Sequence, residues 1–488
     1  MARDPQTALL ALNRFGFGAR GGAVGDLSNA AADPRDFVKA DLTRPNGVLL
    51  EMPGLQGTPA LARAVFGYQA EVKQQREAAK QNAAAEMSDK AAAMETSEKM
   101  GAAPNAPIQA KDVPAKPLNI IQKTYRAEAL ARLQRALVAD CGFAERLVTF
   151  WSNHFCISAA KGELGRIWAG AFEREAIRPY VFARFGDMLK AVEQHPAMLF
   201  FLDNQQSLGP DSPAGQNRKR GLNENLAREI MELHTLGVGG GYTQGDVTSL
   251  ARIITGWTFA GRQGQLGTPG TFVFNINAHQ PGSQLLLGKT YTDTGLTQGE
   301  MALADIARHP STAKFIATKF ARHFVADDPP PALVKRLENT FRKTDGDLLA
   351  LATTLVDSDE AWQAPLTKIR SPYEYLIAAG RLLAQIPDEP SRYLGGLNLL
   401  GQPLWSPSGP NGFADTNAAW AAPEGMKLRL DIAAQIASRL GDNVEPRDLL
   451  ELAAGYAASE ATRQAIERAE SRQQALALLL MSPEIQRR

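Results

Sequence analysis

Apolar residues recur at helical spacing along most of this 488-residue chain, and this periodicity limits the fold more than any other feature. Strand-like alternation is clear only in Thr271–Ile276, which we expect to pair with Gln284–Leu287 across a turn at Pro281 and Gly282. The sequence therefore predicts a mainly α protein: a large multi-helical single domain with a small β-hairpin near 271–288. Amphipathic stripes indicate helices at 306–324, 333–341, 348–356, 373–383 and 428–440.

One segment departs from the helical pattern of apolar residues. Residues 69–117 are rich in Ala, Glu, Lys and Gln, and then contain prolines at 104, 107 and 114. This composition favours a helix but offers no apolar stripe to bury, and the prolines interrupt regular structure. We expect a solvated helical or disordered insert between an N-terminal helical part of the core (1–68) and the main helical core (118–488). A partner-binding arm is the alternative interpretation.

Composition argues against several classes of protein. The 53 Lys and Arg residues balance 52 Asp and Glu residues, so a protein that binds nucleic acid over a broad surface is not expected. The two cysteines, Cys141 and Cys156, are too few for a disulfide-rich scaffold, and we expect both to be buried thiols. There is no apolar run of the ~18 residues that a transmembrane segment needs. The chain also shows no signal peptide, which predicts a cytoplasmic protein.

The densest group of charged and amide side chains lies on a helix expected to end at Gly237. Leu226, Ile230 and Leu233 would form its buried stripe, and Gly237 would stop it. A following capping box, Thr243 to Asp246, begins the next helix.

The polar face of this helix carries Asn225, Glu229 and Glu232 at positions i, i+4 and i+7. Two carboxylates three residues apart can bind a hard cation or share a proton. Alternatively, Arg228 can pair with Glu224 and Glu232 in a ladder of salt bridges, because both lie four residues away. Both interpretations are open at this point.

All six histidines lie between His154 and His323, about a third of the chain, and histidine is a common metal ligand and proton carrier. No two of them have ligand spacing on one helix, so a metal site would have to join separate helices. On an ideal helix His234 faces away from Glu232, so the two could not bind one ion together. Local roles are the alternative: His154 as a hydrogen-bonded core residue, and His195 as the cap before Pro196.

These considerations give a set of candidate site residues. A divalent metal ion is the cofactor to test first. The candidates are Glu229, Glu232, His195 and Arg228 for catalysis, Lys161 and Asn225 for cofactor or anion contacts, and His154, His234 and Glu229 for a metal ion.

The sequence resembles the bacterial family catalogued as domain of unknown function 1800. The resemblance runs from near the N-terminus into the C-terminal third, and its longest block is Asn223–Trp257. The other segments that carry it are Leu12–Gly18, Phe150–Phe155, His195–Asn204 and His309–Asp328.

The chain departs from the family pattern at Ser152, Leu226 and Gly239, where His, Tyr and Asp are usual. If that Asp serves a cation in relatives, Gly239 puts such a site in doubt here. The resemblance implies no reaction, cofactor or catalytic residue. It implies that members are often exported, which makes the envelope or periplasm the alternative location, and often encoded beside a sulfatase-like family, from which a protein partner would come.

Two functions follow from the sequence. The first is a metal-dependent or acid–base enzyme with a polar site between helices, where the Asn223–Gly237 helix meets the segments of His154 and His195. The second is a non-catalytic helical scaffold or accessory protein that acts with an envelope-associated partner. In the second, the same residues form a buried network of hydrogen bonds and salt bridges.

Overall fold

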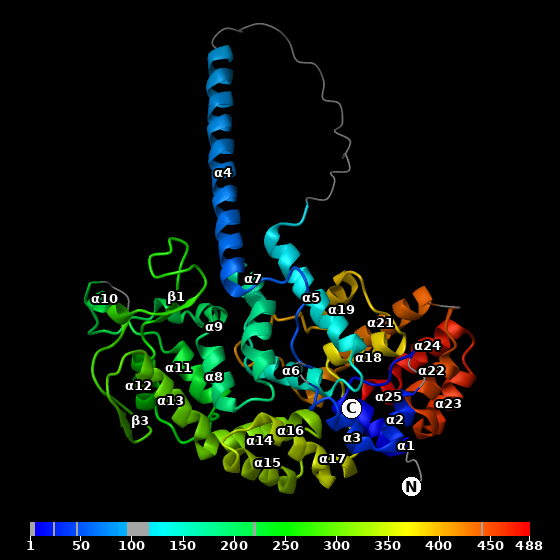
Figure 1. The fold of residues 1–488 in the computed structure, drawn as a ribbon. Helices are drawn as coiled ribbons and strands as arrows, with labels where there is room; N and C mark the ends of the chain where they lie inside the picture. Colours follow the sequence, from blue (N-terminus) through cyan, green and yellow to red (C-terminus); the bar gives the residue numbers. More distant parts are fainter. Residues whose placement is uncertain (1–4, 23–24, 45–46, 95–116, 218–220, 441–442) are drawn as a thin grey trace.

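The computed structural model of the protein describes residues 5–22, 25–44, 47–94, 117–217, 221–440 and 443–488, with residues 5 and 85–94 described by their backbone alone. The part of the predicted insert at 95–116 lies outside the described residues. Helices dominate, which confirms a mainly α protein (Figure 1). No helix in the described ranges is both long enough and apolar enough to cross a bilayer.

The helices form one body from which α4 projects (Figure 1). Those of the N-terminal part are α1 (Pro5–Leu10), α2 (Asp26–Ala32), α3 (Pro34–Lys39) and α4 (Thr58–Met94). The central ones are α5 (Ile120–Val138), α6 (Phe143–His154), α7 (Glu163–Phe172), α8 (Phe185–Glu193), α9 (Pro196–Phe201), α10 (Pro213–Gln216), α11 (Asn225–Glu229), α12 (Gln244–Ile253), α13 (Leu296–Arg308) and α14 (Pro310–Phe324). The remaining ones are α15 (Pro331–Lys343), α16 (Leu348–Asp357), α17 (Asp359–Gln363), α18 (Pro372–Leu382), α19 (Ser391–Leu399), α20 (Asn417–Trp420), α21 (Pro423–Leu440), α22 (Pro446–Ala453), α23 (Glu460–Glu467), α24 (Arg472–Met481) and α25 (Pro483–Gln486).

Four short strands form two antiparallel pairs, and here the predicted pairing was wrong. β2 (Phe272–Phe274) pairs with β1 (Trp257–Phe259). β3 (Gln284–Leu286) pairs with β4 (Lys289–Tyr291). Leu287 and Gly288, with φ of 50° and 77°, form a two-residue connection between β3 and β4. Such a local turn with two positive φ angles matches the twist of a hairpin, so β3 pairs with its immediate neighbour.

Helix α4 is buried only where it carries apolar side chains. Its first turns contain Leu61, Ala62 and Val65, which are buried against the body. Beyond Glu71 its described side chains are mostly exposed, as expected from their Ala, Lys, Glu and Gln composition. The helix therefore continues into solvent as a projecting arm (Figure 1).

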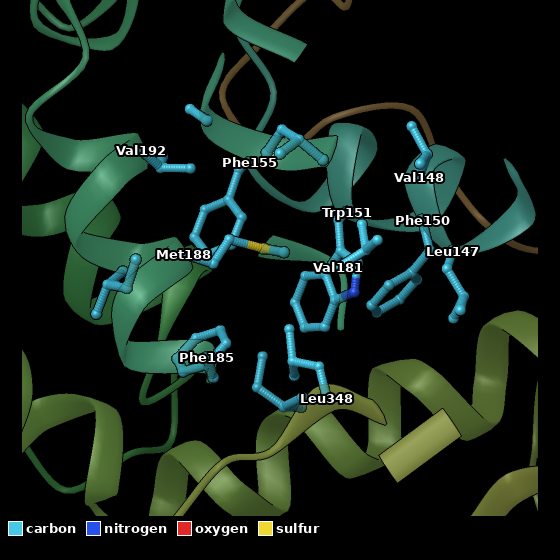
Figure 2. Close-up of a cluster of buried hydrophobic side chains, with 14 of the residues drawn as sticks. Leu147, Val148, Phe150, Trp151, Phe155, Val181, Phe185, Met188, Val192 and Leu348 are labelled. Carbon is cyan, nitrogen blue, oxygen red and sulfur yellow. The ribbon is translucent and has the colours of Figure 1, made fainter. Parts of the chain in front are cut away.

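The core that positions the candidate site lies between α6, α8 and α16. Figure 2 shows Trp151 and Phe155 lying toward Phe185 and Met188 of α8, with Leu348 of α16 below them. Trp151 and Phe155 stack with ring centroids 6.0 Å apart, and all these side chains are buried. Burial of large aromatic groups in such a cluster fixes the C-terminal end of α6, where His154 lies.

Candidate functional site

His154, the last residue of α6, is held by two partners from distant segments. Its Nε2 lies 3.0 Å from the carbonyl oxygen of His234, and its Nδ1 lies 2.9 Å from Nζ of Lys319 on α14. Because a carbonyl can only accept, Nε2 carries the proton, and Nδ1 accepts from the lysine. Burial holds the pKa of His154 well below 6.5, and the nearby Lys319 lowers it further. His154 is therefore a neutral imidazole with both nitrogens in use.

His234 differs from His154, because only one of its two ring nitrogens has a hydrogen-bond partner among the described residues. Its Nδ1 lies 2.8 Å from Oε1 of Glu193, the last residue of α8, and both side chains are fully buried. Nε2 of His234 and Oε2 of Glu193 have no hydrogen-bond partner among the described residues. Buried polar atoms are nearly always paired, so these two atoms, which lie side by side in one pair, need an explanation. We call Glu193, His234, His154 and Lys319 the polar centre.

A π-helical turn decides what lies beside His234. After α11 the chain continues as the π turn η6 (Ile230–His234), in which residue i bonds to residue i+5 rather than i+4. This wider turn brings His234 toward the side of Glu229, five positions earlier, and it buries Met231 while Leu233 is only half-buried. Burial raises the pKa of Glu229, and the charge of His234 opposes that rise. The ideal-helix geometry assumed from the sequence therefore does not apply here.

The other candidates on this helix make their described contacts outside the polar centre. Arg228 pairs with Glu224 at 3.2 Å, as the ladder predicted. Among the described residues, Arg228 does not form the second predicted ion pair, with Glu232. The carboxylate of Glu232 and burial both raise the pKa of Tyr242. Asn225 is exposed, and its backbone N–H donates to the side chain of Asn223.

His195 and Lys161 each have a partner of their own. His195 caps α9 through Nδ1, which accepts from the N–H of Ala197, and its Nε2 lies 3.2 Å from Oε2 of Glu175. Burial would raise the pKa of Glu175, but the hydrogen bonds from His195 and Thr58 outweigh it and the pKa is lowered. Lys161 pairs with Asp203 at 2.6 Å at the surface. Both side chains therefore have local partners, and no described contact joins them to His234.

A second group of buried charges continues from the polar centre along α14. His323 lies one turn after Lys319, and its Nδ1 is 2.8 Å from Oδ2 of Asp415. Glu374 forms ion pairs with Arg146 at 3.1 Å and with Arg488 at 2.9 Å, and all three of these side chains are at most 1% exposed. We call these five residues the charged cluster.

A loop that carries Asp415 is fixed to α6 by an amide pair. The Nδ2 group of Asn153 donates to the carbonyl of Phe413 at 2.9 Å, and the N–H of Phe413 donates to Oδ1 of Asn153 at 2.8 Å. Sγ of Cys156 also contacts this loop, 3.2 Å from the carbonyl of Pro410. Both cysteines are free and buried, as predicted.

Gly412 allows the loop to approach Asn153 of α6 closely, and its replacement tests how much this contact contributes to stability. Its φ is +74°, and a Cβ would lie 2.5 Å from the backbone oxygen of Asn153. We expect Gly412→Ala to lower the free energy of unfolding by about 2 kcal/mol, from the left-handed backbone and the clash together. Gly401→Ala is the matched control, because Gly401 has a φ of +79° with nothing near its Cβ position. Equal losses in urea unfolding for the two variants would show that the contact with Asn153 has no effect on stability.

Sequence reasoning missed Glu193, Lys319, Asp415 and Glu374. Lys319 lies within the amphipathic segment expected at 306–324, where a lysine at i+4 from Phe315 and i−4 from His323 interrupts the apolar stripe. This interruption was the one local signal available. Within the described residues there is no group of three or more His, Cys, Asp or Glu side chains arranged to hold a metal ion.

Comparisons with known proteins place the chain in one family. No curated protein and no solved structure matches the chain significantly. The sequence model of one family, described as "Protein of unknown function (DUF1800)", matches residues 10–487, which is nearly the whole chain. The resemblance noted from the sequence is therefore confirmed: this chain belongs to the DUF1800 family.

Proposed function

We propose that this protein is an acid–base enzyme whose reaction takes place at the polar centre, beside Nε2 of His234. The observation that carries the proposal is the fully buried His234–Glu193 pair, in which Nδ1 faces a carboxylate and Nε2 has no partner among the described residues. An imidazole oriented in this way by a carboxylate is the usual form of a general base.

Glu229 supplies a second proton-transfer group next to that base. It is half-buried, and burial raises its pKa, so it keeps its proton to higher pH than an exposed glutamate does. Two neighbouring groups held in different protonation states can act as acid and base in one reaction. Partial exposure of Glu229 gives a substrate a side from which to approach.

A metal ion held by His154, His234 and Glu229 fits the side chains less well. Both ring nitrogens of His154 are already bonded, Nδ1 to Lys319 and Nε2 to the backbone of His234. A metal ligand needs a free lone pair on one ring nitrogen, and an ammonium group beside His154 repels a cation. His234 and Glu229 remain as donors, which is fewer than the three or four protein ligands of ordinary zinc sites.

The alternative, a non-catalytic scaffold that works with an envelope-associated partner, is favoured by the local pairing of His195, Lys161 and Arg228. It treats Nε2 of His234 and Oε2 of Glu193 like the other buried polar atoms without a partner among the described residues, such as Nε1 of Trp151. The acid–base proposal accounts for both atoms, because a substrate or a water molecule would bond to them.

Replacing His234 with asparagine tests the proposal. Asparagine keeps an N–H for Glu193 but has no group in the place of Nε2. In a screen of esters, amides, glycosides, phosphate esters and carbonyl compounds, we expect the wild-type protein to convert at least one class. His234→Asn is expected to lower kcat/KM for that class by about 100-fold or more.

His309→Asn is the matched control for this test. His309 accepts from the backbone N–H of Ser311 at a helix start and lies outside the polar centre, and asparagine serves well as a cap. We expect this variant to keep wild-type kcat/KM. Full activity in His234→Asn, or no turnover of any class by the wild-type protein, would overturn the acid–base proposal and favour the scaffold.

A further inference from the structure

Lys319 has an unusual environment for a lysine. It lies on the face of α14 that also carries Phe315 and His323, one turn before and one turn after it. Its Nζ lies 5.3 Å from the ring centre of Phe315 and 2.9 Å from Nδ1 of His154. In the described part of the chain, Lys319 makes no ion pair. The amino group therefore faces an aromatic ring and a neutral imidazole, and the residue stays half-buried rather than fully enclosed.

Lys368 shows how the same fold treats a lysine with a structural role. Lys368 is 1% exposed, and its Nζ lies 3.0 Å from both Asp327 and Asp415. Two carboxylates compensate its charge, as is usual for a buried ammonium group. Lys319 has no such compensation, so its burial disfavours the charged form.

Burial lowers the pKa of both lysines, and for Lys368 its two carboxylates oppose the shift. Burial lowers the pKa of Lys319 to about 8, and Arg322 contributes to the lowering, whereas Cys156 and Asp415 oppose it. With this pKa about one molecule in ten carries a neutral amine at pH 7, compared with fewer than one in a thousand for a lysine with the usual pKa near 10.4. Only the neutral amine has a lone pair for attack on carbon.

We propose that Lys319 is a covalent nucleophile that condenses with an aldehyde or ketone, which makes a carbonyl compound the substrate of the polar centre. This inference rests on the proposed function and specifies its substrate class. The side chain is partly exposed, and the Phe315 ring offers an apolar surface beside Nζ.

The chemistry of the proposed step balances without an oxidant or a reductant. The ammonium group first releases a proton to solvent, and the neutral Nζ then attacks the carbonyl carbon to form a carbinolamine. Loss of one water molecule, containing the carbonyl oxygen and the two remaining amine hydrogens, leaves a C=N double bond between substrate and Nζ. Hydrolysis by water reverses both steps and restores the free lysine.

Propanal and sodium borohydride test the proposal directly on the wild-type protein. Borohydride donates hydride to the C=N bond and converts the reversible imine into a stable propyl-lysine, which peptide mass spectrometry locates. Lys314 is the matched control, because it lies on the same helix and is exposed. At pH 7 and limiting propanal, we expect propylation of Lys319 at least ten times faster than that of Lys314.

Equal or slower propylation of Lys319 would overturn the proposal, since an exposed lysine would then be at least as reactive. Lys319→Arg is expected to lose the rapid labelling while leaving Lys314 labelled as before. His234→Asn separates this inference from the proposed function. Fast labelling with no turnover in the substrate screen would contradict the acid–base enzyme only, and turnover that depends on His234 without fast labelling would contradict the carbonyl substrate only.

Discussion

Replacing Glu374 with glutamine is expected to lower the free energy of unfolding by about 3–5 kcal/mol. Glu374 is 1% exposed and lies between Arg146 and Arg488, which are both fully buried. Burial would raise the pKa of Glu374, but these two guanidinium groups outweigh it and lower the pKa to about 2. Glutamine keeps the shape of the side chain but removes its charge, so two buried cations lose their shared anion.

Urea unfolding at neutral pH measures this loss, and an exposed pair provides the control. Glu360 forms a bidentate salt bridge with Arg336, with N–O distances of 2.6 and 3.0 Å, near the surface. We expect Glu360→Gln to cost at most about 1 kcal/mol, because water solvates both partners after the change. A cost for Glu374→Gln no larger than that of Glu360→Gln would contradict the role given to the charged cluster.

Acidification from pH 6.5 to pH 4 is expected to remove about 3 kcal/mol of stability through His323. Burial lowers the pKa of His323 to about 4, with Arg488 and Arg146 acting in the same direction and Asp415 opposing them. In the unfolded chain the pKa is near 6.5, so between these values the unfolded state binds a proton that the folded state does not. Stability is therefore complete above about pH 6.5 and falls by about 1.4 kcal/mol per pH unit until pH 4.

His323→Asn isolates this contribution in unfolding curves measured at several pH values. Asparagine keeps an N–H for Asp415 but does not titrate, so we expect a shallower pH dependence by about 1.4 kcal/mol per unit between pH 4 and 6.5. His154 is expected to cause part of the remaining dependence, since its pKa is also lowered. An unchanged slope would show that His323 binds its proton equally well in both states.

Most of the helices could be predicted from the sequence, because the information for them is local. The capping boxes at Thr243 and Ser371, and the caps His195 and His309 before proline, each involve residues within three positions of one another. The capping box at Thr243 and the helix start at His195 and Pro196 are confirmed by the structure. The predicted pairing of β2 was wrong because strand pairing is not local information. The actual partner, β1, is separated from β2 by the connection from Phe259 to Phe272.

The candidate site was predictable only in part. His154, His234 and Glu229 were singled out as rare or clustered chemical groups. The ring centroids of His154 and His234 lie 6.2 Å apart, and the charge of His234 acts on Glu229. Their assigned partnership as metal ligands assumed free side chains, and the residues that engage His154 and His234 come from elsewhere. Lys319 is 165 positions from His154, and Glu193 is 41 positions from His234. Nothing in local periodicity connects residues that far apart.

The sequence alone determined the helical class of this protein, the starts of many helices, the projecting arm of α4 and the identity of the groups able to move protons. These properties depend on contacts within a few turns of helix, and on whether a segment has an apolar face to bury. Only the tertiary structure decided which of those groups keep an unpaired atom. It did so through the π turn that reorients His234 and through the folding of α8 and α14 against the end of α6, because pairing and burial depend on side chains that folding brings together from distant parts of the chain.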